Sequence, residues 1–371
     1  MDAALIWEWV IKSVIILLIM LTGFAYLTFY ERKALARIQV RIGPNRAGPG
    51  GWLQPLADGI KLIFKEELIP AEAEKITFIL APIITVVPAL IITAVLPWGG
   101  TVQVFGRQVS LSLANINVGV LYIMAIASIA VYGIVLAGWS SNNKYATMGG
   151  LRASAQMISY ELALGTAFAL PVLLAGSMNL NEIVAAQNGV WWYALLQPVG
   201  FFIFLIASLA EVNRAPFDMP EAEQELTAGY HTEYSGMKFA LFFMAEYIKM
   251  IAVSAFAATF FLGGYRGPGV EVYPWLGPLY LFIKVFVLLF WMIWMRATLP
   301  RFRYDRLMAF GWKVLFPTAF ANLLMTAVVV VIWPQASGAA LFVPLLVVNV
   351  LSLLLAIVLL AAGLGGKKNV A

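Results

Sequence analysis

Residues 10–30 read VIKSVIILLIMLTGFAYLTFY, an apolar stretch whose one charged residue is Lys12. Crossing the hydrocarbon core of a bilayer takes about 20 predominantly apolar residues in a helix. Lipid offers the backbone no hydrogen-bond partner, so a run of this length forms a helix rather than a loop. Glu31, Arg32 and Lys33 follow immediately, where a cleavable signal peptide would have small residues. The stretch therefore predicts a permanent transmembrane helix.

Eight more apolar runs of similar length predict a bundle of such helices. They occupy residues 78–97, 116–138, 160–176, 191–210, 239–262, 276–295, 312–333 and 341–360. Over all 371 residues, 62% are hydrophobic and 12% are charged, whereas soluble domains carry about 25% charged residues. This composition excludes a soluble protein. We expect an all-α polytopic membrane protein, one integral domain over residues 1–371 with about nine transmembrane helices.

The distribution of Lys and Arg predicts the orientation in the membrane. With nine crossings, 19 of the 24 Lys and Arg residues fall on one side. Cytoplasmic loops are the ones enriched in these residues. We therefore expect the N-terminus outside and the C-terminus in the cytoplasm, in a bacterial cytoplasmic membrane.

The chain has no cysteine and a single histidine, His231. It can form no disulfide, and it has no thiolate for an iron–sulfur cluster or a zinc site. A haem held by two histidines is excluded as well. We expect the chain to bind no metal and no cofactor of its own.

The segment of residues 31–75 combines many cations with a turning loop and an amphipathic helix. The loop reads GPNRAGPGG over residues 43–51, and its prolines and glycines predict a specific shape. Polar residues then recur from Gln54 to Lys65 at spacings of four, three and four, which gives the predicted helix one polar and one apolar face. Such a helix either lies on the lipid surface or forms the wall of a site for a ligand with a polar head and an apolar tail.

The segment of residues 211–238 is acidic, with six carboxylates, and begins EVNRAPFDMPEAEQEL. Cytoplasmic loops are normally basic, so this charge has to be compensated. Glu221, Glu223 and Glu225 stand close enough to repel one another, which favours protonation of some of them and suits proton transfer near neutral pH. The alternative is a solvated acidic loop that docks on a basic partner.

The segment of residues 296–313 is basic, and the three segments together hold 28 of the 43 charged residues. All three lie on the predicted cytoplasmic side. The basic segment either balances the acidic loop or binds anionic lipid head groups. We expect partner subunits to dock on this side of the membrane.

A few ionisable residues fall within the apolar runs, where a charge is costly and points to function. They are Lys12, Glu161, Glu246, Lys249 and Lys284. Glu246 and Lys249 are three positions apart, so a purely structural ion pair is the alternative. For Glu161 the alternative is a carboxylate that caps a helix or reaches the interface. His231 fits a hydrogen-bonded interface histidine better than a proton shuttle.

Four stretches of the sequence are similar to one protein family. They are ERKALARIQVRIGPNRAGPGGWLQPLADGIKLIFKE (31–66), GWSSNNKYATMGGLRASAQMISYE (138–161), EVNRAPFDMPEAEQELTAGYHTEYSGMKFALFFMAEY (211–247) and RATLPRFRYDRLMAFGWK (296–313). They resemble the family of the membrane H subunits of the proton-pumping NADH:quinone oxidoreductase, respiratory complex I. The resemblance covers about residues 20–333, so the run at 341–360 is an extra C-terminal helix beyond an eight-helix family core.

The resemblance implies a subunit that joins the membrane arm to the peripheral arm and forms the entrance and much of the wall of the quinone chamber. Quinone is then the substrate, and flavin and iron–sulfur clusters belong to partner subunits. The partners implied are other membrane and peripheral-arm subunits, above all the iron–sulfur and hydrophilic subunits of the quinone site, with membrane lipids and no nucleic acid. The residues implied at the chamber are Arg32, Arg37, Arg41, Trp52, Asp58, Lys61 and Phe217.

The resemblance also implies a chain of glutamates that couples quinone reduction to proton translocation, in a subunit without redox chemistry of its own. The glutamates are Glu211, Glu221, Glu223, Glu225, Glu161 and Glu246. Residues with a structural or coupling role are Arg214, Asp218, His231, Lys249, Arg296 and Arg301.

Two other functions remain open at this point. One is the membrane anchor of an energy-converting hydrogenase-type complex, and the other is a free-standing ion transporter. The complete GPNRAGPGG loop and the stretch GYHTEYSGMK at 229–238 favour the quinone enzyme over the first. Charges crowded at one edge of the membrane, rather than at the midplane, favour a docking platform over the second.

Overall fold

The computed structural model describes residues 3–104, 106–187, 189, 191–219, 227–334 and 338–365. Within these ranges, eight helices are long and apolar enough to cross a membrane. They are α1 (Ala3–Ile38), α3 (Lys75–Ile91), α4 (Gly119–Ser140), α5 (Lys144–Ala175), α10 (Gly236–Phe261), α11 (Leu276–Thr298), the continuous rod of α12 (Tyr304–Phe310), the π-helix η4 (Gly311–Leu315) and α13 (Phe316–Ile332), and α14 (Ala339–Gly365). The predicted all-α polytopic fold is confirmed.

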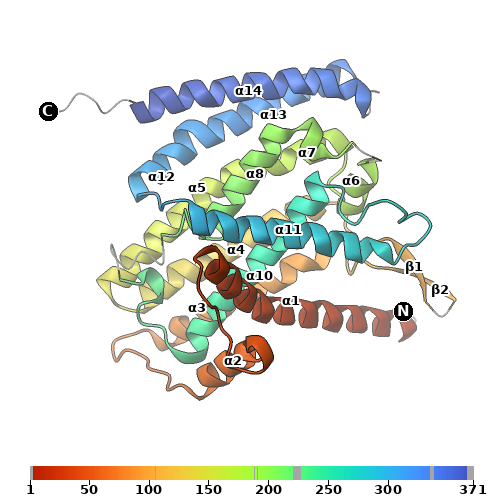
Figure 1. The fold of residues 1–371 in the computed structure, drawn as a ribbon. Helices are drawn as coiled ribbons and strands as arrows, with labels where there is room; N and C mark the ends of the chain where they lie inside the picture. The colour runs from red at the N-terminus through yellow and green to blue at the C-terminus, as the bar shows by residue number, and fades with distance from the viewer. Residues whose placement is uncertain are drawn as a thin grey trace.

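The remaining elements are short. The helices are α2 (Gln54–Phe64), α6 (Leu180–Ala186), α7 (Tyr193–Leu196) and α8 (Pro198–Glu211), and the 3-10 turns are η1 (Pro49–Gly51), η2 (Ile92–Val95) and η3 (Gly229–His231). Strands β1 (Thr101–Val104) and β2 (Arg107–Ser110) pair antiparallel, with Val102 opposite Val109. Figure 1 shows this hairpin at the same end of the bundle as the start of α1, whereas α14 finishes at the opposite end.

The apolar run at 191–210 forms two helices instead of one. Gln197, which has non-helical φ and ψ of −131° and 60°, separates α7 from α8. Pro198 opens α8, where its missing N–H costs nothing, but it cannot continue the hydrogen bonds of α7. The long helices number eight in the described ranges, and α8 is a shorter apolar helix beside them. The pair α7–α8 therefore takes the place of the apolar run predicted at 191–210, in broken form.

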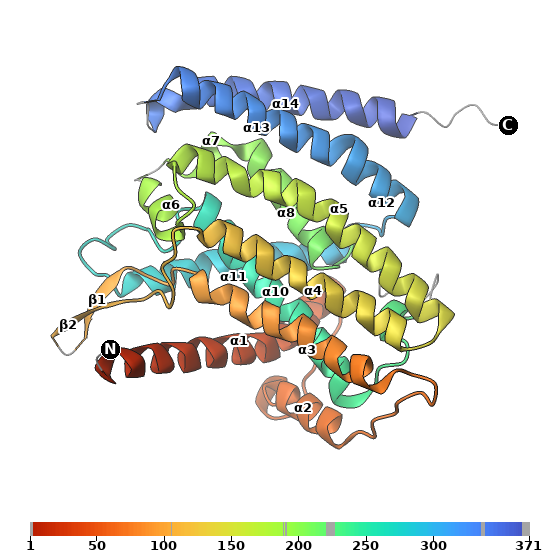
Figure 2. The ribbon, with the colours of Figure 1, turned by 180° about the vertical axis from the view of Figure 1, so that it is seen from behind.

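The core of the bundle lies where α5, α8 and α10 meet. Tyr160 from α5, Phe204 from α8 and Phe260 from α10 are each fully buried in one hydrophobic cluster. Helix α2 is different, because none of its residues is buried. It packs against α1 and α10 at the edge of the bundle, as Figure 2 shows.

Lys284 carries a charge within an apolar helix, and backbone carbonyl groups compensate that charge. Its Nζ donates hydrogen bonds of 2.7, 2.8 and 2.7 Å to the carbonyl oxygens of Leu262, Gly264 and Arg266. It also lies 4.8 Å from the ring centre of Trp192. These carbonyls follow the last turn of α10, so the ammonium group caps that helix.

A close backbone contact holds η3 against α5. A Cβ at Gly149 would lie 2.5 Å from the Cα of Gly229, which is a backbone atom that cannot rotate away. Small residues allow such close approach between segments of membrane proteins. The contact matters for the site described below, because η3 carries Tyr230 and His231.

We expect Gly149→Ala to destabilise the bundle, because the added methyl group forces η3 off α5. Overpacking of this kind costs about 1–3 kcal/mol. The temperature at which half of this chain is unfolded in the purified assembly would fall by several degrees. Gly59→Ala is the matched control, since a Cβ at Gly59 meets nothing within 4 Å. An equal effect of both substitutions would contradict the assigned contact.

Candidate functional site

The loop after α1 has the specific shape that its sequence predicts. Lys33 Nζ donates a 2.6 Å hydrogen bond to the carbonyl oxygen of Gly50, which ties the loop back to α1. Gly51 has φ of +86°, and a Cβ there would overlap the carbonyl oxygen of Pro44. Only glycine tolerates both constraints. The loop therefore returns the chain to α1 and starts α2 beside it.

An ion pair joins α1 to α2. Arg32 Nη1 donates a 2.6 Å hydrogen bond to Asp58 Oδ2. On the other side of the carboxylate, Gln54 Nε2 donates a 3.1 Å hydrogen bond to Oδ1, and Lys61 Nζ lies 4.0 Å away. Gln54, Asp58 and Lys61 occupy one face of α2, as the spacing predicts.

The opposite face of α2 is apolar and exposed. Its four large side chains are between 48% and 84% exposed. They are Leu56, Ile60, Ile63 and Phe64. Trp52, which is 60% exposed, packs with its ring centre 5.8 Å from those of Tyr26 and Phe29 on α1. The junction of α1 and α2 thus presents a polar cluster beside an uncovered apolar surface.

The structure separates the other predicted chamber residues from this cluster. Arg37 and Arg41 are exposed near the end of α1, and Arg41 contacts Gln39 rather than Asp58. Phe217 lies elsewhere, with its ring 5.8 Å from that of Tyr160 and 5.7 Å from that of Phe302. Arg32, Trp52, Asp58 and Lys61 are therefore the members that come together.

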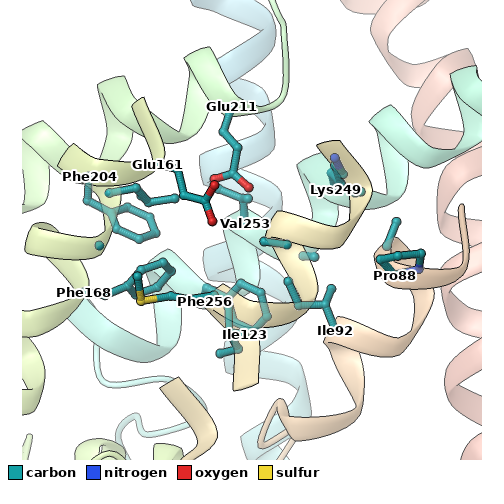
Figure 3. Close-up of a pocket in the computed structure, with 17 residues that line it drawn as sticks. Pro88, Ile92, Ile123, Glu161, Phe168, Phe204, Glu211, Lys249, Val253 and Phe256 are labelled. Carbon is teal, nitrogen blue, oxygen red and sulfur yellow. The ribbon is translucent and has the colours of Figure 1, made fainter. Parts of the chain in front are cut away.

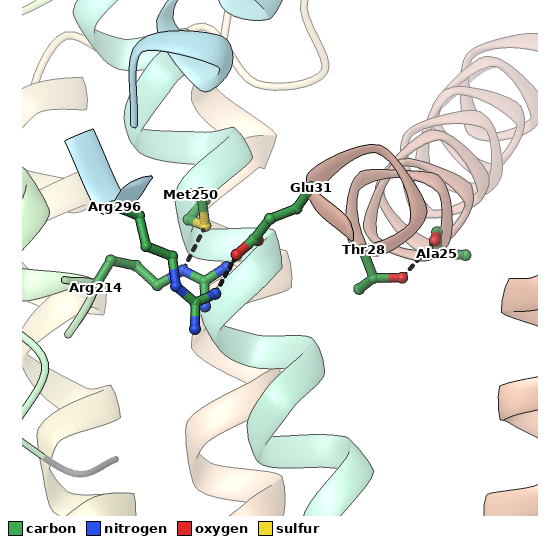
Figure 4. Close-up of polar contacts among 6 residues, drawn as sticks. All are labelled: Ala25, Thr28, Glu31, Arg214, Met250 and Arg296. Carbon is green, nitrogen blue, oxygen red and sulfur yellow. Dashed lines mark hydrogen bonds and ion pairs between the residues drawn. The ribbon is translucent and has the colours of Figure 1, made fainter. Parts of the chain in front are cut away.

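A buried ion cluster links three distant segments at the end of α1. The carboxylate of Glu31 accepts hydrogen bonds from Arg214, in the loop after α8, and from Arg296, in the last turns of α11 (Figure 4). Arg214 is also placed 4.4 Å from the ring centre of Tyr247. Burial alone would lower the pKa of Arg214, but the negative charge of Glu31 raises that pKa above its ordinary value. The guanidinium therefore stays charged although it is buried.

Glu31 is a residue that sequence reasoning did not assign to the site. Its partner Arg214 is 183 positions away, and Arg296 is 265 positions away. The one available signal in the sequence was an acidic residue directly after an apolar run. That signal does not predict which residues the carboxylate contacts.

Glu161, Glu211 and Lys249 line one small cavity between α3, α4, α5, α8 and α10 (Figure 3). The carboxylates of Glu161 and Glu211 point toward each other, and Ser128 Oγ donates a hydrogen bond to Glu161. The cavity measures about 30 Å³ and is otherwise mostly apolar. It is large enough for one or two water molecules, and it has the polar groups that ordered water needs. Such a group can hold and exchange protons away from bulk solvent.

A second buried group lies between η3 and α10. Glu246 accepts a 3.4 Å hydrogen bond from Tyr230 Oη, and His231 Nε2 lies 3.8 Å from the same oxygen. His231 Nδ1 is buried and has no hydrogen-bond partner among the described residues. Among the described residues no close ion pair joins Glu246 to Lys249, although their charges interact at longer range. Glu246 faces η3, and Lys249 faces the cavity.

Several predicted residues remain outside these groups. Glu221, Glu223 and Glu225 lie outside the described residues. Asp218 is buried in the same loop as Arg214, and Arg301 is exposed.

We expect Glu31→Gln to destabilise the protein strongly, because it leaves two arginines without their carboxylate. Removing one partner of a buried ion pair costs about 3–5 kcal/mol. The yield and thermal midpoint of the purified assembly measure this loss. Glu8→Gln in the same helix is the control, because Glu8 forms a part-exposed pair with Lys12 that is worth less than about 1 kcal/mol. Similar losses from the two variants would refute the assigned role.

The comparisons with known proteins identify the family. A family profile described as NADH dehydrogenase matches residues 11–327. The H subunit of the NADH-quinone oxidoreductase of Protochlamydia amoebophila is 54% identical over 306 residues, which cover 82% of this chain and 92% of the relative. The second H subunit of the NADH-quinone oxidoreductase of Geobacter sulfurreducens is 54% identical over 85% of this chain and 94% of the relative.

A third relative extends the match to a further bacterium. NADH-quinone oxidoreductase subunit 8 of Thermus thermophilus is 51% identical over 324 residues, which cover 87% of each chain. The match to the family profile ends at residue 327, before the start of α14. The chain therefore belongs to the NADH dehydrogenase family, as a membrane subunit of the kind named the H subunit of NADH-quinone oxidoreductase.

Proposed function

We propose that this chain forms the membrane-side entrance and wall of the quinone site of a proton-pumping NADH:quinone oxidoreductase. One observation carries the proposal: the Arg32–Asp58 ion pair lies beside the exposed apolar face of α2. A quinone has a polar head and an apolar tail, and this junction offers groups that suit each part. The names of the relatives support the choice of quinone.

The chemistry is divided between this chain and its partners. A chain without cysteine holds no iron–sulfur cluster through thiolates, so electrons from NADH arrive through flavin and clusters in partner subunits. Reduction of a quinone to the quinol takes up two electrons and two protons. The residues at the α1–α2 junction guide and orient the quinone, and the iron–sulfur and hydrophilic partners complete the site of its head group.

Coupling to the membrane runs through the buried carboxylates. Quinone reduction changes the charge at the site and draws protons from the residues near it. Helix α10 carries Glu246 one turn before Lys249, so it places the Tyr230–His231–Glu246 group next to the cavity of Glu161 and Glu211. A shift in the protonation of Glu246 alters the electrostatic balance of Lys249 and the two glutamates, because like and unlike charges interact strongly in a medium of low dielectric constant. Glu221, Glu223 and Glu225 belong to the same proposed chain.

The orientation follows from the same proposal. Partner subunits dock on the cytoplasmic face of a bacterial cytoplasmic membrane, where the basic and acidic segments lie. The N-terminus is then outside and the C-terminus in the cytoplasm. Co-purification with flavin and iron–sulfur subunits would support this assignment, whereas co-purification with a hydrogenase module, or activity as a lone carrier, would support one of the two other functions.

We expect Asp58→Asn to lower NADH:quinone reductase activity about tenfold in the intact complex, because the quinone wall loses its ion pair and Arg32 its position. NADH oxidation by a water-soluble artificial acceptor, which bypasses the membrane site, would stay unchanged. The exchange Arg32→Asp with Asp58→Arg would restore part of the activity if the pair itself matters. Arg46→Gln is the control, since Arg46 is an exposed cation of the loop between α1 and α2. Loss of activity with both acceptors would contradict the proposal.

We expect Glu211→Gln to reduce proton translocation by about tenfold or more, because the amide cannot accept the proton that the cavity group must exchange. The measurement is the pH change in sealed vesicles during NADH oxidation, with the amount of assembled complex determined in parallel. Glu182→Gln, at an exposed glutamate on α6, is the matched control. Undiminished translocation by the Glu211 variant would refute a role for this cavity in coupling.

A further inference from the structure

A second and much larger cavity lies away from the α1–α2 junction. It is a groove between α8, α11, α12 and the last turns of α14, with a volume of about 1030 Å³. This volume reaches the upper end of the range of ligand pockets, about 300–1,000 Å³. Its inner wall includes Pro216 and Phe217 from the loop that follows α8. Within the described part of the chain, no residue of α1 or α2 lines it.

One part of the groove is lined by apolar side chains from two transmembrane segments. Phe202, Ile206 and Leu209 lie on one face of α8, at spacings of four and three. Trp291 and Met295 lie four positions apart on α11 and face them across the groove. Phe202 is 59% exposed, so this lining is open to the acyl chains of the membrane. The surface suits a long apolar chain.

The other part of the groove is cationic. Three basic residues line it: Arg303, which immediately precedes α12, Arg306 on α12, and Lys313 on the π-helix η4 that follows. Asp305 is the acidic residue of the lining, and its Oδ2 lies 3.5 Å from Arg303 Nε. Among the described residues, Arg306 and Lys313 have no carboxylate partner. Counted over the described lining residues, this end of the groove carries a net positive charge of two.

We propose that this groove binds one anionic phospholipid. The phosphate lies among Arg303, Arg306 and Lys313, and the acyl chains follow α8 and α11. A net positive charge selects an anionic over a zwitterionic head group, and the length of the apolar lining excludes a free phosphate as the preferred ligand. The bound lipid fills the space beside Ala362 and so connects α14, which lies beyond the family match, to the common bundle.

The test is lipid retention by the purified complex. Native mass spectrometry during titration with phosphatidylglycerol counts bound lipids and gives an apparent Kd for the tightest one. Each cation near an anionic head contributes about a fivefold factor in affinity, so Arg306→Gln with Lys313→Gln would weaken binding about thirtyfold. Lys75→Gln, at an exposed cation outside the groove, is the control. An unchanged Kd in the double variant would overturn the proposal.

A second measurement identifies the occupant directly. A phosphatidylglycerol with a photoreactive group on its acyl chain would label peptides that contain Trp291 and Met295, and a phosphatidylcholine analogue would label them several-fold less. Equal labelling by both lipids would overturn the preference for an anionic head. Absence of lipid labelling, together with cross-links from these positions to another subunit, would show that a protein covers the groove and would likewise overturn the proposal.

Discussion

The pairing of Glu31 with Arg214 and Arg296 is the interaction on which the charged end of the bundle depends. None of these charges is stable alone among apolar helices, and together they hold α1, the loop after α8 and the end of α11 in one arrangement. Adjacent helical residues point about 100° apart. With Glu31 fixed inward, Arg32 turns outward to Asp58, so the buried cluster also positions the exposed one.

The same electrostatic constraint organises the carboxylates within the bundle. Glu161 and Glu211 share a cavity with Lys249, and Glu246 lies against Tyr230 and His231. Each acidic group is held by neighbours from other segments, not by a residue of its own helix turn. The close contact of Gly149 with Gly229 brings η3 near enough for this arrangement. Close backbone packing is therefore what allows the charge of Glu246 to be compensated by residues of η3.

The membrane class, the long helices and the polar face of α2 could be predicted from the sequence, because these depend on runs and spacings of neighbouring residues. The break at Gln197 could not, since hydropathy averaged over about 20 residues passes over one proline at 198. Spacing alone also suggested a Glu246–Lys249 pair, whereas tertiary neighbours turn the two side chains to different groups. The partners of Glu31 could not be predicted from the sequence, because no periodicity connects residues so far apart.

Helix α2 contributes no buried residue, although it forms part of the proposed substrate wall. Substitutions at such exposed positions usually change the free energy of unfolding by less than about 0.5 kcal/mol. Selection can therefore vary the apolar face of α2 residue by residue while the core of the bundle stays intact. If α2 forms part of the proposed quinone wall, the same scaffold adapts in this way to quinones with tails of different length, or to membranes of different thickness, without a new fold.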